Sequence, residues 1–115
     1  MALGDTYSGV FSNNAQVEDR LMQASVVAGE RMWRMPLADE YRELNKSLIA
    51  DIKNTGNRYG GAITAALFLS EFVDAVPWVH VDIAGPSNSS KESGVMVKGA
   101  TGVPVRTLCE FMRGA

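Results

Sequence analysis

The first regular pattern of apolar residues predicts an amphipathic helix. An opening that mixes glycine, serine and asparagine with one short apolar stretch precedes it, and predicts a loop followed by a short strand. Asn13 or Asn14 is suited to cap the helix, and Gly29 is suited to end it. The apolar residues that recur at helical spacing are Val17, Leu21, Ala24 and Ala28.

The middle of the chain predicts a short helix and then an extended segment. Pro36 ends the element before it, because the residue preceding a proline disfavours the helical conformation. Asp39 is placed to cap a short helix that continues through Leu44. The sequence SLIADIKN, residues 47–54, alternates loosely between apolar and polar positions and predicts a strand or extended segment.

The second half predicts a helix, a strand and a final helix. Residues 61–73 carry apolar side chains on every face, so we expect this helix to be buried on most sides. Residues 78–84 predict a strand, and the sequence SNSSKESG after it predicts a solvated loop. Pro104 is suited to the first turn of a C-terminal helix. In the strand, alternation puts Val79, Val81 and Ile83 on one face and Trp78, His80 and Asp82 on the other.

These elements together predict an α/β fold. An apolar strand that follows a buried helix is typical of a parallel or mixed sheet covered on both faces. A chain of 115 residues forms at most one domain, and it can hardly supply all the layers that such elements need. We therefore expect part of a mixed β-sheet sandwiched between helices, cut from a larger domain.

Composition narrows the classes of partner and compartment. The chain is 46% hydrophobic and 21% charged, with a formal net charge of -2 and no basic cluster, which argues against nucleic acid and membrane surfaces. Its single cysteine, Cys109, cannot form an internal disulfide and fits a reducing compartment. No apolar run approaches the roughly 20 residues of a membrane helix, and the first residues lack a secretion signal. We expect a cytoplasmic protein.

Three groups of residues could carry chemistry of their own. His80 and Asp82 could offer two metal ligands from one strand face, but no second histidine or zinc motif accompanies them. We interpret them as a buried polar pair hydrogen-bonded to its neighbours. Cys109 lies at helical spacing among apolar residues, which favours core packing over a nucleophile. Ser87 and Ser89 lack the surrounding glycines of a nucleophile elbow.

The glycine-rich loop at residues 54–61 has two interpretations. Backbone N–H groups ahead of a helix can surround a phosphate. The loop matches neither the P-loop pattern nor the dinucleotide-binding pattern, and no strong strand precedes it at the required spacing. Glycines also serve where the backbone needs positive φ angles or where a helix and a strand approach closely. We favour this second interpretation.

Four stretches, in order, resemble the C-terminal part of the leucine aminopeptidase (cytosol aminopeptidase) family. They are WRMPLADEY, SLIADIKNTGNRYGGAITAALFLSEFV, PWVHVDIAG and GATGVPVRTL. The resemblance covers nearly the whole chain and departs from the family between Pro86 and Val97. It identifies residues 1–115 as the C-terminal part of a leucine aminopeptidase catalytic domain.

The resemblance implies a metal-dependent exopeptidase that removes N-terminal residues from peptides. In this family two divalent ions, zinc, manganese or magnesium, polarise the scissile carbonyl and activate water, and an arginine holds a bicarbonate that carries the proton. The enzymes form hexamers. The family's metal ligands, catalytic lysine and bicarbonate arginine lie upstream of the segments matched here. We therefore expect no catalytic residue, no bound metal and no activity in this chain alone, and we expect the missing N-terminal portion as its partner.

The resemblance also assigns part of a substrate pocket. Thr55 and Gly61 match positions beyond the scissile bond, Ala84 matches the floor of the pocket for the N-terminal side chain, and Ser87 matches its wall. One alternative stays open, namely a stand-alone assembly or regulatory module that kept this half-fold and lost the chemistry. A reading frame that continues upstream with the lysine and acidic motifs would distinguish a fragment from such a module.

Overall fold

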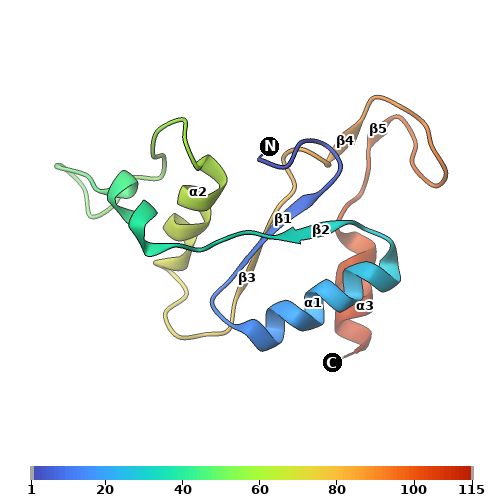
Figure 1. Ribbon diagram of the computed structural model, residues 1–115, viewed down its shortest axis with the longest axis horizontal. Helices are drawn as coiled ribbons and strands as arrows, with labels where there is room; N and C mark the ends of the chain where they lie inside the picture. The colour runs from blue at the N-terminus through green and yellow to red at the C-terminus, as the bar shows by residue number, and fades with distance from the viewer. Residues whose placement is uncertain (1, 115) are drawn as a thin grey trace.

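The computed structural model describes residues 2–114 and builds them around a three-stranded sheet (Figure 1). The strands are β1 (Ser8–Ser12), β2 (Met32–Arg34) and β3 (Val79–Asp82), with β1 in the centre. β2 is parallel to β1 and β3 is antiparallel to it, so the sheet is mixed. A second, two-stranded antiparallel sheet joins β4 (Asn88–Ser89) to β5 (Gly99–Ala100).

Helices lie on both faces of the larger sheet. α1 (Ala15–Ala28) and α3 (Val105–Arg113) pack against each other on one side, and α2 (Gly61–Ser70) lies on the other (Figure 1). The predicted α/β arrangement of a mixed sheet between helices is therefore confirmed. Within residues 2–114, no helix combines the length and the apolar character needed to cross a membrane.

Two apolar clusters hold these layers together, one on each side of β1. Val10 and Phe11 are adjacent, fully buried, and point to opposite faces, as successive strand residues must. Val10 packs in the cluster with α1, and Phe11 packs against α2. β3 follows the same alternation, which confirms the predicted faces: Val79 and Val81 join the Val10 cluster, and Trp78 joins the Phe11 cluster.

The termini of α1 follow from local sequence. The Asn14 side chain accepts a hydrogen bond from the Val17 N–H at 2.9 Å, which satisfies one of the free donors of the first turn. Gly29 has φ 73°, and its N–H bonds back to the last turn of the helix. Both predicted caps are confirmed. At α3 the prediction is one residue off, because Pro104 lies at the N-cap and the helix begins at Val105.

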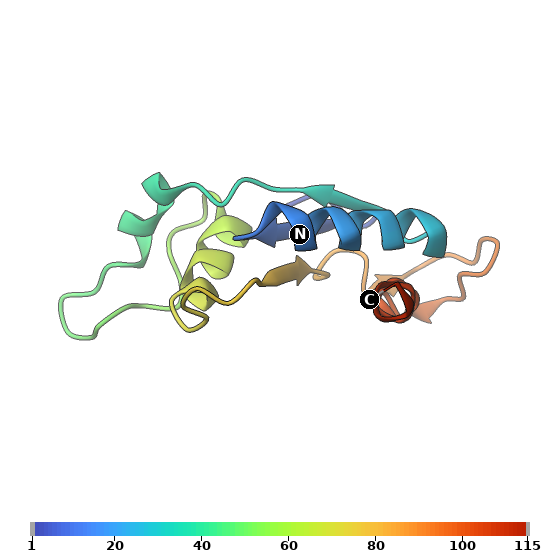
Figure 2. The ribbon, with the colours of Figure 1, turned by 90° about the horizontal axis from the view of Figure 1, so that it is seen from below.

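The strand considered for residues 47–54 is wrong. This segment forms bends without a strand partner, and the Lys53 N–H donates to the Asn45 carbonyl at 2.8 Å to close it as a loop. Leu48 and Ile49 are almost fully exposed in this loop. Figure 2 shows the loop extending from the body of the molecule. A loose alternation cannot define a strand when no neighbouring strand lies beside it.

The short helix η1 (Asp39–Asn45) is a 3-10 helix, and its predicted cap is wrong. Ala38 occupies the N-cap position, and no side chain caps the helix. The Asp39 carboxylate instead bonds Arg42 at 2.8 Å. Arg42 also pairs with Glu71 at 2.6 Å, so its guanidinium joins η1 to the end of α2.

Three further predictions need correction. α2 ends at Ser70 rather than at residue 73; within it one stripe, Gly61, Ala65 and Leu69, is exposed and the other positions are buried or half-buried, as predicted, whereas Phe72 lies beyond the helix and is 68% exposed. β3 covers only four of the seven predicted residues, so Ala84 lies in a turn. Cys109 is exposed rather than packed in the core. It lies two residues from both Thr107 and Phe111, and residues two apart on a helix face different ways.

The molecule is flat and open for its size. Its extents are 49 × 33 × 18 Å, and Figure 2 shows the thin dimension edge-on. Its accessible surface is 7678 Å², whereas a folded monomer of 12.4 kDa is expected to expose about 6,100 Å². About 1,500 Å² more surface is therefore exposed than a closed domain of this mass would show.

Candidate functional site

The first predicted site segment is the loop that leads into α2. Thr55 is exposed, and its hydroxyl donates to the side chain of Asn54 at 3.3 Å. Gly56 lies so close to Leu44 and Thr64 that an added Cβ would meet their side chains at 3.1 and 3.2 Å. The glycine there allows the loop to approach η1 and α2 closely.

Gly60 and Gly61 form the junction between this loop and α2. Gly60 has φ 60°, a conformation that glycine adopts without steric cost, and it occupies the N-cap of α2. Gly61 is exposed, and an added Cβ there would meet no atom within 4 Å. The conformational interpretation of the glycine-rich loop is supported at Gly60, whereas phosphate binding stays an untested alternative.

The second predicted segment is the turn that follows β3. The Ala84 N–H donates to the Asp82 carboxylate at 3.0 Å, and the Ser87 N–H donates to the Ile83 carbonyl at 2.9 Å. Ala84 is exposed and Ser87 is half-buried. A Cβ added at Gly85 would overlap the backbone carbonyl of Gly4, so the chain leading into β1 lies directly against this turn.

The two segments follow each other along the chain, with α2 and β3 between them. In Figure 1 the chain enters α2 in the left part of the view, whereas β3 runs up the middle and continues as coil toward β4. The chain reverses direction between the two segments, through the turn after α2. Thr55 and Gly61 belong to the segment that leads into α2, and Ala84 and Ser87 belong to the turn after β3.

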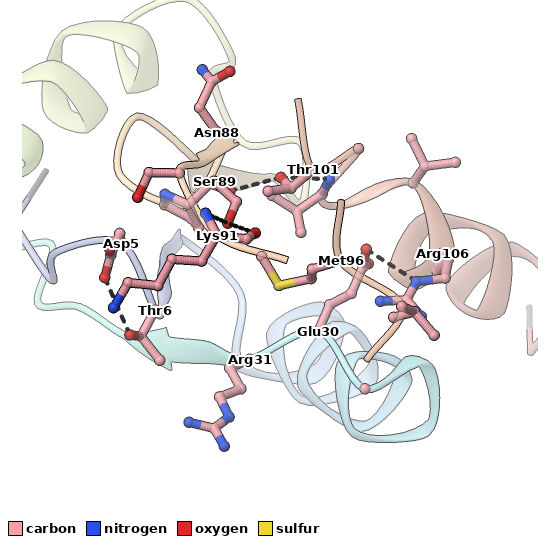
Figure 3. Close-up of a pocket in the computed structure, with 17 residues that line it drawn as sticks. Asp5, Thr6, Glu30, Arg31, Asn88, Ser89, Lys91, Met96, Thr101 and Arg106 are labelled. Carbon is pink, nitrogen blue, oxygen red and sulfur yellow. Dashed lines mark hydrogen bonds and ion pairs between the residues drawn. The ribbon is translucent and has the colours of Figure 1, made fainter. Parts of the chain in front are cut away.

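A cavity of about 800 Å³ lies beside the second segment (Figure 3). It is partly open to solvent and is lined by the start of the chain, the α1–β2 connection, the β4–β5 hairpin and the start of α3. Pro86 and Asn88, which flank Ser87, line it, but none of the four predicted site residues does. Charged groups of both signs surround it: Asp5, Glu30, Arg31, Lys91 and Arg106.

Glu30 is the buried acid of this cavity, and its carboxylate is already bound. One oxygen accepts hydrogen bonds from the Thr107 N–H at 2.8 Å and from the Thr107 hydroxyl at 2.7 Å. The other oxygen lies 3.5 Å from the Arg106 guanidinium. Glu30 therefore anchors the first turn of α3, where a negative charge is favourable.

Sequence reasoning missed Glu30 and Thr107 because they are 77 positions apart. It also missed Asn13, whose amide donates to the Val76 carbonyl at 2.9 Å and accepts from the Trp78 N–H at 2.8 Å. Two asparagines precede α1, and one of them suffices to cap the helix. The second asparagine could therefore have indicated a contact elsewhere in the fold. Nothing local indicated the partner of Glu30.

His80 and Asp82 are both half-buried on β3, and they make different contacts: Asp82 accepts from the Ala84 N–H, and His80 stacks among aromatic rings. The His80 ring lies 6.2 Å from the Trp78 ring, nearly parallel to it, and 5.8 Å from the Phe11 ring. Burial lowers the pKa of His80 from its ordinary value of 6.5, and the neighbouring Asp82 charge opposes part of that change. Across residues 2–114 no three histidine, cysteine, aspartate or glutamate side chains gather to hold a metal ion. The residues present do not fit a catalytic metal centre.

Residues 1–109 match the family described as "Cytosol aminopeptidase family, catalytic domain". The chain is 53% identical over 112 residues to a probable cytosol aminopeptidase of Gloeothece citriformis, which covers 97% of this chain and 23% of that protein. It is 50% identical over 113 residues to a probable cytosol aminopeptidase of Koribacter versatilis, with 98% and 22% covered. The chain thus spans less than a quarter of the length of these relatives.

Two solved structures are also similar to nearly all of this chain, and this chain again covers only about a quarter of each. A tomato leucine aminopeptidase mutant is 43% identical and superposes with a TM-score of 0.91 over 99% of this chain and 22% of its own. The bottromycin maturation enzyme BotP in complex with Mn is 38% identical, with a TM-score of 0.92 over 98% of this chain and 25% of its own. The fold described above is therefore shared with one part of much longer enzymes.

Proposed function

This chain belongs to the cytosol aminopeptidase family, and from that premise we propose that it is part of a longer metal-dependent aminopeptidase. The longer protein hydrolyses N-terminal residues from peptides. Residues 1–115 form the C-terminal part of its catalytic domain. The observation that carries the proposal is the family match over residues 1–109, in a chain whose fold superposes on leucine aminopeptidase over nearly its whole length.

The part played by this chain is to shape the substrate pocket. Gly61 and Ala84 carry little or no side chain, and both are exposed. This exposure leaves space for a substrate side chain once the rest of the protein covers these positions. Thr55 adds a hydroxyl beyond the scissile bond, and Ser87 adds one to the pocket wall. We assign none of these residues a catalytic role, because the resemblance places the family's metal ligands and catalytic lysine upstream of the matched segments.

The cofactor is a pair of divalent ions, zinc, manganese or magnesium, held outside residues 2–114. One structural relative is a complex with Mn, which supports a divalent ion in the longer protein. The excess exposed surface supports the missing N-terminal portion as a partner, and family membership supports a homo-oligomer, a hexamer by resemblance. Because the relatives are named cytosol aminopeptidases, we place the protein in the cytoplasm.

The test compares the longer protein with the pure chain of residues 1–115 on a leucyl chromogenic substrate. The longer protein should release the chromophore, lose activity with a chelator and regain it with manganese, zinc or magnesium. The pure chain should release none under any of these conditions. Turnover by the pure chain that a chelator does not affect would contradict the proposal, and so would a longer protein that is inactive with all three metals.

A further inference from the structure

Thr101 contacts the turn after β3 through two separate hydrogen bonds. Its hydroxyl donates to the Pro86 carbonyl at 2.7 Å, and its backbone N–H donates to the Ser87 carbonyl at 2.9 Å. The same hydroxyl accepts a weaker bond from the Val103 N–H at 3.4 Å. One half-buried residue thus holds two consecutive carbonyls of the turn and is itself oriented by the chain that follows it.

The rest of the turn is held by its own hydrogen bonds and by the start of the chain. Asp82 holds the Ala84 N–H, Ile83 holds the Ser87 N–H, and Gly85 is packed against Gly4. Those contacts come from the turn itself and from the start of the chain. Thr101 lies in the connection between β5 and α3, fifteen residues from Pro86, and bonds the carbonyls of Pro86 and Ser87. Removing the Thr101 hydroxyl would free the Pro86 carbonyl while leaving every contact inside the turn intact.

We propose that Thr101 is a positioning residue for substrate selection: by fixing the carbonyls of Pro86 and Ser87, it sets the place of the Ser87 wall relative to the Ala84 floor. The proposal rests on the proposed function, in which Ala84 and Ser87 line the pocket for the N-terminal side chain. A wall displaced by a fraction of an ångström alters the fit of large and small side chains unequally, because close packing tolerates little change in volume. Thr101 does not touch the reacting atoms.

The chain offers a matched set of variants. Thr101→Val keeps the shape and loses the hydroxyl, whereas Thr101→Ser keeps the hydroxyl and loses the methyl group. Thr6→Val makes the same change at another threonine that lines the same cavity, where the hydroxyl donates to the exposed side chain of Asp5. Each variant is made in the longer protein and assayed on leucyl and alanyl substrates with saturating metal.

The ratio of kcat/KM between the two substrates is the readout. Thr101→Val should change this ratio by about 3- to 10-fold, mainly through KM, which is the effect expected of one lost hydrogen bond. Thr101→Ser should restore the wild-type ratio, and Thr6→Val should leave it unchanged. A general loss of folding would lower activity on both substrates alike, so an unchanged ratio in Thr101→Val overturns the proposal.

Amide hydrogen exchange gives a second readout that needs no activity. Exchange in a peptide covering residues 83–89 should speed up in Thr101→Val and stay at the wild-type rate in Thr101→Ser and Thr6→Val. Unchanged exchange in Thr101→Val overturns the positioning role. If the wild-type longer protein shows no metal-dependent hydrolysis, the proposed function is wrong, and so is the role of Thr101 in substrate selection. The hydrogen-exchange measurement then still decides whether Thr101 holds the turn after β3.

Discussion

Gly85 lies so close to Gly4 that a side chain at position 85 would overlap the Gly4 carbonyl oxygen. This contact joins the chain leading into β1 to the turn that carries Ala84. Because the obstacle is backbone rather than a flexible side chain, it cannot move aside without shifting the start of the sheet.

Gly85→Ala should therefore destabilise the fold by about 1–3 kcal/mol, the range seen when a group is forced into filled space. Thermal unfolding measures the effect. Gly61→Ala is the matched control, because its Cβ would meet nothing and alanine favours the helix that begins there. Equal unfolding temperatures for the two variants would contradict the close packing at Gly85.

Asn13→Ala should cost about 1–3 kcal/mol of unfolding free energy, because it removes both bonds of the side-chain amide to the segment before β3. Asn13→Asp keeps the acceptor for the Trp78 N–H and loses the donor to Val76, so its loss should be intermediate. Denaturant unfolding of the three proteins tests the order. An Asn13→Asp variant as unstable as the alanine variant would show that the acceptor contributes nothing.

Glu30 and Thr107 should be energetically coupled. Each hydrogen bond to a buried carboxylate contributes about 1.5–3 kcal/mol, so Glu30→Gln and Thr107→Val should each destabilise α3, and the double variant should lose less than their sum. Arg106→Gln serves as the control, because an ion pair whose arginine is half exposed contributes about 1 kcal/mol or less. Strict additivity of the first two variants would contradict the coupling.

The stability of the protein should fall as the pH drops below about 6.5, in part because of His80. The pKa of His80 is lower in the folded state, so the unfolded chain binds the proton first. The loss therefore begins near the unfolded pKa and stops growing below the folded one. His80→Gln should show a smaller drop in unfolding temperature between about pH 7.5 and 5.5. His80 is the single histidine, so an identical drop in both proteins would exclude it as the cause.

The isolated chain of residues 1–115 should self-associate or require the complementary portion of the longer protein. Its exposed apolar residues include Leu48, Ile49, Phe72 and Met112, and large apolar patches on a free surface promote association. Sedimentation at low micromolar concentration, together with thermal unfolding, measures this. A compact monomer with a concentration-independent transition would show that the chain closes its own core and would favour the stand-alone module.

Local and periodic features could be predicted from the sequence. The caps at Asn14 and Gly29 depend on bonds within four residues, so the bounds of α1 needed no knowledge of the rest of the fold. The opposite faces of β3 follow from the two-residue period of a strand, whatever lies on either side. The positions proposed for the substrate pocket came from resemblance, and the structure adds where they lie.

Only the tertiary structure decided which segments have neighbours. Residues 47–54 have the alternation of a strand but no strand beside them, and backbone pairing needs a partner that the sequence does not name. Cys109 has apolar neighbours in sequence, yet its face of α3 is open. The bonds from Thr101 to the turn after β3 and from Asn13 to the segment before it join residues 15 and 65 positions apart. Such contacts form only after the chain has folded, so no local pattern records them.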